Sequence, residues 1–238
     1  MPPVKGSTRS YRASPLRERQ AAETRHAILR AGRDLFLDQG YGATTLDQIA
    51  AKAGVSKPTV FTAVGNKQAV LAAVRDVALA GDDLPVPVAE REAFQAVVAE
   101  PDSFRALALM VEHLAELWRR YGPIREVMRG AASNGEPALR HLWDRSEQQR
   151  HHGARAFIDT LTTKSPLRDG LDPDTATDIM WMHMNPDVYM GLVGRRGWSE
   201  AAYCQWLVDT LATALLPPRR RSREGPRRPT GAASRSRR

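Results

Sequence analysis

The chain has 238 residues, of which 42% are hydrophobic, so it can bury a substantial core in one large or two small domains. Charged residues interrupt its apolar runs before they reach about 18 residues, which argues against a membrane-spanning helix. The amino terminus is basic and lacks the apolar segment of a secretory signal. A single cysteine, Cys204, permits no internal disulfide. We therefore expect a soluble, cytoplasmic protein.

The net charge of +8 is distributed unevenly along the chain. Residues 1–74 carry +6 (11 Lys and Arg against 5 Asp and Glu), residues 75–216 carry −6 (15 against 21), and residues 217–238 carry +8 (9 against 1). Clustered Lys and Arg favour a polyanionic partner. The basic front and tail are therefore the candidate nucleic-acid-binding parts, and we expect another role for the acidic middle.

Helical periodicity dominates the sequence, and runs of alternating β-branched residues are missing, which predicts an all-α fold. In the first third of the chain we predict helices over about 16–39, 45–53, 57–64 and 67–80. Gly40 is the expected end of the first helix. The Pro-rich stretch GDDLPVPVAERE that follows residue 80 is a candidate domain boundary.

The rest of the chain continues the helical pattern. We predict helices over about 107–121, 124–132, 137–163, 173–184 and 199–215. Gly122 and Pro123 are expected to separate the first two, and Pro186 to kink or split the helix that begins at Pro173. Ser199 is the expected N-cap of the last helix.

Two short helices joined by a Gly-containing turn lie within TTLDQIAAKAGVSKPTVFTAVGNK, residues 44–67. This spacing fits a helix-turn-helix, whose first helix crosses the DNA backbone and whose second enters the major groove. Gly54 permits the left-handed turn, Ser56 caps the second helix, and Val60 turns inward. A helical hairpin inside an α-bundle has the same spacing, but the +6 charge of this part favours DNA.

The exposed face of the second short helix carries the predicted base contacts. Lys57, Thr59, Phe61 and Thr62 stand on that face, where they can reach base edges or thymine methyl groups. Lys67, at the start of the following helix, is expected to hold a phosphate.

Residues 20–75 resemble the DNA-binding domain of the TetR (tetracycline-repressor) family of bacterial transcription regulators. The likeness is carried by Phe36, Gly40, Tyr41, Thr44-Thr45, Ile49-Ala50, Ala53-Gly54-Val55-Ser56, Thr59-Val60-Phe61 and Lys67. It implies a homodimer in which a divergent helical domain binds a small effector and dimerises. It also implies DNA contacts, and with Pro58 added the predicted set is Thr45, Lys57, Pro58, Thr59, Phe61, Thr62 and Lys67. The family usually carries Tyr at the position of Phe61, and an aromatic pair in place of Ala63-Val64.

Four segments are therefore predicted: a disordered basic arm (1–19), a helix-turn-helix DNA-binding domain (20–75), a helical effector-binding and dimerisation domain (76–216), and a disordered Arg-rich tail (217–238). The arm is expected to reach the minor groove, and the tail either adds unspecific phosphate contacts or is a solvated charge run.

By the resemblance, the subunits pair through their last two long helices. The predicted dimer interface is Tyr189, Tyr203, Trp206, Leu207 and Leu211. The alternative is that these side chains form the core of one subunit. A dimer would hold two recognition helices about one DNA turn apart, roughly 34–36 Å, and so would require a near-palindromic operator.

An effector pocket is expected between helices that carry large apolar and aromatic side chains. The candidate lining residues are Met110, His113, Leu114, Trp118, Tyr121, Trp143, Phe157 and Met180. Such side chains also fill ordinary cores, so the pattern indicates only an apolar or aromatic effector. We expect no cofactor and no metal site, because His141, His151 and His152 lie in a charged stretch without a suitable ligand spacing.

The sequence thus favours a dimeric DNA-binding regulator, a repressor that a small effector releases from a palindromic operator. The alternative is a helical nucleic-acid-binding adaptor without an effector pocket. An enzyme is not expected, because the chain shows no nucleophile elbow, phosphate loop, metal-ligand cluster or dinucleotide fingerprint. An RNA binder would carry aromatic stacking platforms in its basic arm and tail, where Tyr11 is the only aromatic residue.

Overall fold

The computed structural model describes residues 15–84, 86 and 90–218. These residues form an all-α fold without strands, as the periodicity predicts. Its helices are α1 (Pro15–Ala43), α2 (Leu46–Ala53), α3 (Lys57–Ala63), α4 (Lys67–Ala80), α5 (Glu92–Ala99), α6 (Ser103–Ser133), α7 (Pro137–Thr162), α8 (Pro173–His183), α9 (Pro186–Tyr189), the π-helix η2 (Met190–Arg195) and α10 (Glu200–Leu215). None of these helices combines the length and the apolar character of a membrane span.

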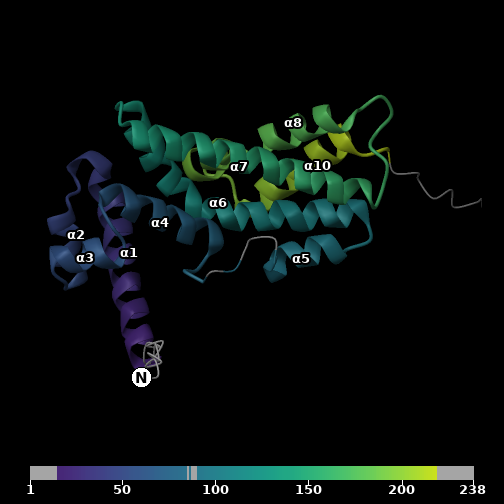
Figure 1. Ribbon diagram of the computed structural model, residues 1–238. Coiled ribbons are helices and arrows are strands. Elements are labelled where there is room, and N and C mark those ends of the chain that lie inside the picture. Colours follow the sequence, from purple (N-terminus) through teal and green to yellow (C-terminus); the bar gives the residue numbers. More distant parts are fainter. Residues whose placement is uncertain (1–14, 85, 87–89, 219–238) are drawn as a thin grey trace, which may run out of the picture.

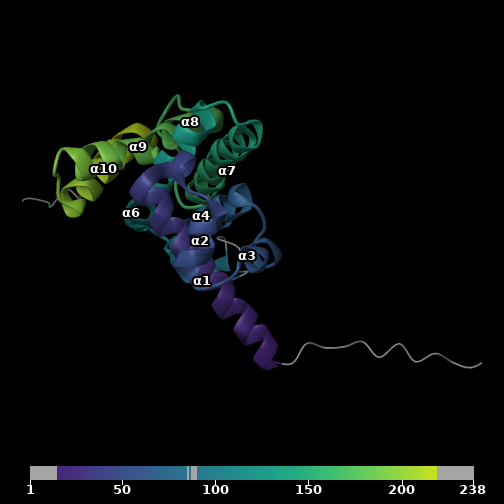
Figure 2. The same ribbon diagram turned by 90° about the vertical axis from the view of Figure 1, so that its left-hand side faces the viewer.

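The helices are arranged in two parts joined by α4. Figure 1 shows α2 and α3 at one end of the molecule and the bundle of α6, α7, α8 and α10 extending toward the other end. Figure 2 views the molecule from the end that carries α2 and α3. Helix α4 packs against both α1 and α6, so one rigid element contacts the amino-terminal helices and the bundle.

Local sequence signals determine the amino-terminal helices. Thr45 and Gln48 form a complete capping box at the start of α2, and Gly54 ends the helix with a left-handed φ of 69°. Ser56 caps α3 by accepting a hydrogen bond from the backbone N–H of Thr59. A shared core holds these helices together, formed by the fully buried side chains of Ile28, Phe36, Ile49 and Val60. The predicted positions of α2, α3 and α4 are confirmed.

The first helix begins next to its predicted start at about residue 16, so the predicted disordered arm ends too late. Residues 15–19 of the predicted disordered arm belong to α1, so Arg17 and Arg19 are helical. Pro15 suits a first helical position, and the residues after it are good helix formers. Gly40, with φ 79° and ψ 169°, breaks the helical geometry where its end is predicted. The rest of the arm and residues 219–238 of the tail lie outside the described residues.

The predicted break at Gly122 and Pro123 is wrong, because α6 continues through Pro123. A proline inside a helix removes one backbone hydrogen bond. The neighbouring Tyr121 and Ile124 are buried, so tertiary packing holds the helix despite this loss. Gly122 has a separate role: a Cβ added there would lie 2.6 Å from the Sδ atom of Met190, so the glycine permits this close approach.

Three further features concern α5, the split at Pro186 and the cap at Ser199. Helix α5 was not predicted; it follows the Pro-rich stretch and packs on α6, with Val97 fully buried. The predicted split at Pro186 is confirmed, since α8 ends at His183 and α9 begins at Pro186. The predicted N-cap at Ser199 is also confirmed.

Candidate nucleic-acid interface and ligand cavity

Helix α3 lies at the surface with one side turned into the core. Val60 is 0% exposed, whereas its neighbour Phe61 is 64% exposed. Lys57, Pro58 and Thr62 are exposed as well, and Thr59 is half-buried. The helix therefore presents a mixed aromatic, hydroxyl and cationic face, which is the chemistry that reads base edges and thymine methyl groups.

The polar groups of this face have weak internal partners. The Lys57 Nζ atom donates to the Asp47 carboxylate at 3.0 Å, and both side chains are largely exposed. The Thr62 hydroxyl donates to the carbonyl of Pro58, and Thr45 is occupied by the capping box of α2. Exposed ion pairs contribute little to stability, so a DNA phosphate can replace Asp47 as the partner of Lys57.

Lys67 lies in a different environment from the other predicted contacts. Its Nζ atom donates to the backbone carbonyl of Tyr41 at 3.0 Å. The same atom lies 4.1 Å from the centroid of the Tyr41 ring. An ammonium group has three donors, so two N–H groups of Lys67 are left over for a phosphate.

A polar bridge joins this region to the bundle. The Tyr41 hydroxyl donates to the Glu136 carboxylate at 3.4 Å, and Gln68 Nε2 donates to the same oxygen at 3.3 Å. Burial and the nearby Glu136 charge raise the pKa of Tyr41 well above its ordinary value. Glu136 precedes α7, so the bridge connects the helix-turn-helix part with the turn between α6 and α7. Sequence reasoning missed Glu136, because no local pattern links it to Tyr41 across 95 residues.

A cavity of about 500 Å³ lies among α4, α5, α6, α7 and the end of α8. Its size is within the range of small-molecule sites. Five of the eight predicted pocket residues line it: Met110, His113, Leu114, Trp118 and Tyr121. The other three do not line it. Phe157 and Met180 are fully buried in the core, and Trp143 packs under the guanidinium of Arg125 at 4.3 Å.

Three arginines that sequence reasoning did not select also line the cavity: Arg75, Arg125 and Arg150. All three side chains are nearly buried. Arg75 could have been noticed in the sequence, because it is a charged residue within the apolar stretch VLAAVRDVALA. No comparable signal marks Arg150, whose neighbours in sequence are polar, and Arg125 is followed directly by Glu126.

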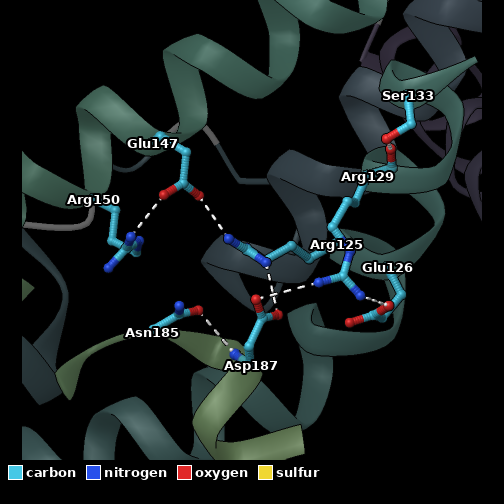
Figure 3. Close-up of polar contacts among 8 residues, drawn as sticks. All are labelled: Arg125, Glu126, Arg129, Ser133, Glu147, Arg150, Asn185 and Asp187. Carbon is cyan, nitrogen blue, oxygen red and sulfur yellow. Dashed lines mark hydrogen bonds and ion pairs between the residues drawn. The ribbon is translucent and has the colours of Figure 1, made fainter. Parts of the chain in front are cut away.

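Glu147 connects two of these arginines (Figure 3). Its carboxylate accepts hydrogen bonds from Arg125 at 2.8 Å and from Arg150 at 2.6 Å. Burial opposes ionisation of Glu147, but the hydrogen bonds from the two guanidinium groups outweigh it and hold its pKa below the usual range. Arg125 also donates to Asp187 at 2.9 Å, so the network ties α6, α7 and α9 together.

The residues predicted for the dimer interface mostly belong to the core of the single chain. Tyr203, Leu207 and Leu211 are fully buried, and Tyr189 is nearly so. Without exposed surface, these side chains cannot contact a partner while the subunit keeps this fold. The prediction that these residues form a dimer interface therefore needs correction. The alternative, that they form the core of one subunit, agrees with their burial. Trp206 is half-buried and contacts Trp198, an exposed aromatic residue, edge to face.

The histidines considered for metal binding, His141, His151 and His152, are exposed. Within the part of the chain that the structure describes, no group of three or more His, Cys, Asp or Glu side chains is placed to hold a metal ion.

Comparisons with known proteins identify the family. Residues 28–74 match the model described as "Bacterial regulatory proteins, tetR family". The uncharacterized HTH-type transcriptional regulator YdeS of Bacillus subtilis (strain 168) is 30% identical over 164 residues, which cover 66% of this chain and 74% of that protein.

Two solved structures share the fold. NalD, the secondary repressor of the MexAB-OprM multidrug efflux pump in Pseudomonas aeruginosa, has a TM-score of 0.63 and 20% identity, and the match covers 83% of this chain and 98% of NalD. The transcriptional regulator FadR from Bacillus subtilis, in complex with stearoyl-CoA, has a TM-score of 0.63 and 15% identity, covering 79% and 98%.

These matches agree with the geometry. The family model covers the helices that build the helix-turn-helix. The family and the similar proteins are transcriptional regulators and not enzymes. The helical bundle corresponds to the carboxy-terminal domain of the solved neighbours. The chain therefore belongs to the tetR family of bacterial regulatory proteins and is a DNA-binding transcriptional regulator.

Proposed function

We propose that this regulator is a homodimeric repressor that binds a near-palindromic operator through α3 and leaves it when a small molecule fills the cavity. The observation that carries the proposal is the pair of neighbours on α3, where Val60 is fully buried and Phe61 is 64% exposed. This arrangement fixes the helix to the domain on one side and leaves an aromatic and cationic face for the major groove. The protein works in the cytoplasm, where its operator is.

In this proposal the residues of the interface have separate roles. Phe61, Thr59 and Thr62 contact base edges and thymine methyl groups, and Thr45 and Pro58 lie against the backbone at the edges of the helix-turn-helix. Lys57 exchanges its ion pair with Asp47 for a phosphate, and Lys67 donates to a second phosphate.

For the dimer we propose the surface of the bundle that carries Trp198 and Trp206, in place of the buried residues of α10. Trp198 is an exposed large aromatic residue and Trp206 is half-buried beside it. Aromatic side chains are enriched at protein interfaces. Two copies paired there would present the same patch to each other, as an isologous contact requires.

The route from the cavity to DNA passes through α4. This helix begins at Lys67, next to α3, and its second half contributes Arg75, Leu79 and Ala80 to the cavity wall. A ligand that contacts these residues favours one position of α4 over another, and so changes the spacing of the recognition helices. The cavity argues against an adaptor without an effector pocket.

Selection of duplexes from a random pool, followed by gel-shift titration, tests the DNA-binding proposal. Phe61→Ala is expected to lower affinity for the selected duplex by at least about tenfold, because the substitution removes the largest contact on α3. Leu37→Ala is the matched control, since Leu37 is an exposed apolar residue on α1 of the same domain. Equal losses in the two variants would show that α3 is not the reading helix.

A further inference from the structure

We propose that the cavity takes an amphipathic organic anion, with Arg75 holding the acidic group and the apolar wall along α6 holding the rest of the molecule. The inference rests on the proposed effector function and specifies its ligand class. It replaces the apolar or aromatic effector that the sequence alone indicates.

The charges of the arginine network beside the cavity balance one another (Figure 3). Arg125 pairs with Glu147 and Asp187, and Arg150 shares Glu147. Arg129 pairs with Asp187 and with Glu126. Three guanidinium groups thus meet three carboxylates, and the network is neutral without a ligand.

Arg75 lies outside this balance. Its side chain is 8% exposed, whereas its one carboxylate partner, Asp76, has a side chain that is 66% exposed and also lines the cavity. Its other guanidinium contact is the neutral amide of Gln149. Its Nε atom has no hydrogen-bond partner. Burying a cation is costly unless an anion and hydrogen-bond acceptors compensate it, so an acidic group delivered through the cavity has a favourable position here.

Hydrogen-bond donors without partners are concentrated on this wall. Of the described residues that line the cavity, three have a buried side-chain polar atom without a partner: the Nε atoms of Arg75 and Arg150 and the indole Nε1 of Trp118. All three atoms are donors, so what the wall lacks is acceptors. A carboxylate or a phosphate supplies acceptors and negative charge together.

The rest of the cavity suits an apolar body. Met110, Leu114 and Phe94 line it, and on α6 the eleven helical steps from Met110 to Tyr121 extend over about 16 Å. Burial, with the Arg120 charge, lowers the pKa of His113, so that residue adds no positive charge to this part at neutral pH. The cavity thus joins an extended apolar wall to a nearly buried cation whose one carboxylate partner, Asp76, is largely exposed.

The same features disfavour a cationic ligand. Of the two carboxylates that line the cavity, Glu147 is already shared by two arginines and Asp76 is paired with Arg75. A ligand ammonium would therefore meet Arg75 without a free counter-charge.

Isothermal titration of the full-length protein with ligands that share one chain and differ in head group tests this inference. The probes are decanoate, decyl phosphate, 1-decanol and decylammonium, each below its micelle concentration. At least one of the two anions is expected to bind about tenfold or more tightly than the alcohol, because the anion gains a charge-assisted hydrogen bond. Decylammonium is expected to bind most weakly. The two anions distinguish a carboxylate head group from a phosphate.

Arg75→Met removes the guanidinium while keeping the apolar stem. It is expected to abolish the preference for the anion over 1-decanol and to leave the binding of the alcohol unchanged. Arg140→Met is the matched control, because Arg140 is exposed on α7 and does not line the cavity. If Arg75→Met does not fold, the comparison of head groups on the unaltered protein still decides.

The proposal is overturned if neither anion binds at millimolar concentration, if the four head groups bind equally, if the ammonium binds best, or if Arg75→Met keeps the anion preference. Release of DNA is measured separately by gel shift. Anions that bind through Arg75 without releasing DNA would refute the proposed regulation while the ligand class stands. Release by decylammonium alone would refute the ligand class while the regulation stands.

Discussion

Substituting Glu147 by Gln tests the arginine network beside the cavity. The carboxylate accepts charge-assisted hydrogen bonds from two nearly buried guanidinium groups, those of Arg125 and Arg150. A glutamine oxygen can serve one of them, and its amide donors face the other. Arg125 keeps Asp187 and Arg150 keeps the carbonyl of Trp181, so the loss is limited to about one charge-assisted bond and one buried counter-charge. We expect a destabilisation of about 2–3 kcal/mol.

Urea denaturation followed by tryptophan fluorescence measures this change in the free energy of unfolding. In a thermal scan the same loss lowers Tm by roughly 4–12 °C for a chain of this length. Glu126→Gln is the control, because Glu126 contacts Arg129 at a more exposed position, and its change should stay below about 0.5 kcal/mol. A Glu147→Gln variant as stable as this control would refute the network as a source of stability.

Three further predictions address pH, packing and DNA contacts. The pKa of Glu147 is lower in the folded than in the unfolded protein, so its ionised carboxylate stabilises the fold above about pH 4.3, and this stabilisation is lost as the pH falls through the folded pKa. In acid unfolding, Glu147→Gln should therefore lose less stability than the unaltered protein over that pH range. Gly32→Ala should destabilise the fold by about 1–2 kcal/mol, because the new Cβ would lie 2.7 Å from Val70. Gly130→Ala is the control and should stabilise the fold slightly, because the space around Gly130 is open. Equal effects of the two variants in urea denaturation would contradict this prediction. Lys57→Ala should weaken operator binding and reduce the salt slope by about 1, and Asp47→Asn should strengthen binding in the same titration; unchanged affinities would remove Lys57 from the interface.

Sequence reasoning succeeds where the structure is determined by local chemistry. The capping box at Thr45, the left-handed Gly54 and the cap at Ser56 act within a few residues, so they can be recognised without knowledge of the fold. The same holds for Pro186 and Ser199, which divide the last helices. These signals were sufficient to locate α3 and to predict which of its residues face outward.

Sequence reasoning fails where contacts between distant segments determine the structure. Pro123 stays inside α6 because the residues around it are packed against other helices, which no local rule contains. Tyr203, Leu207 and Leu211 show the same periodicity whether they face a partner or their own subunit, and only the burial of the single chain assigns them to its core. Arg75 on α4 and Arg150 on α7 line one cavity although they are 75 positions apart in the sequence, and no local pattern indicates that they meet.

The most direct test of the account is a hydroxyl-radical footprint of the full-length protein on the selected duplex, compared with the footprint of Phe61→Ala. If two copies of α3 enter the DNA, two half-sites are protected about one helical turn apart, roughly 10 base pairs or a multiple of this, and both protections are lost in the variant at equal protein concentration. Protection without this spacing, or protection that Phe61→Ala leaves unchanged, would contradict the claim that two copies of α3 enter the DNA.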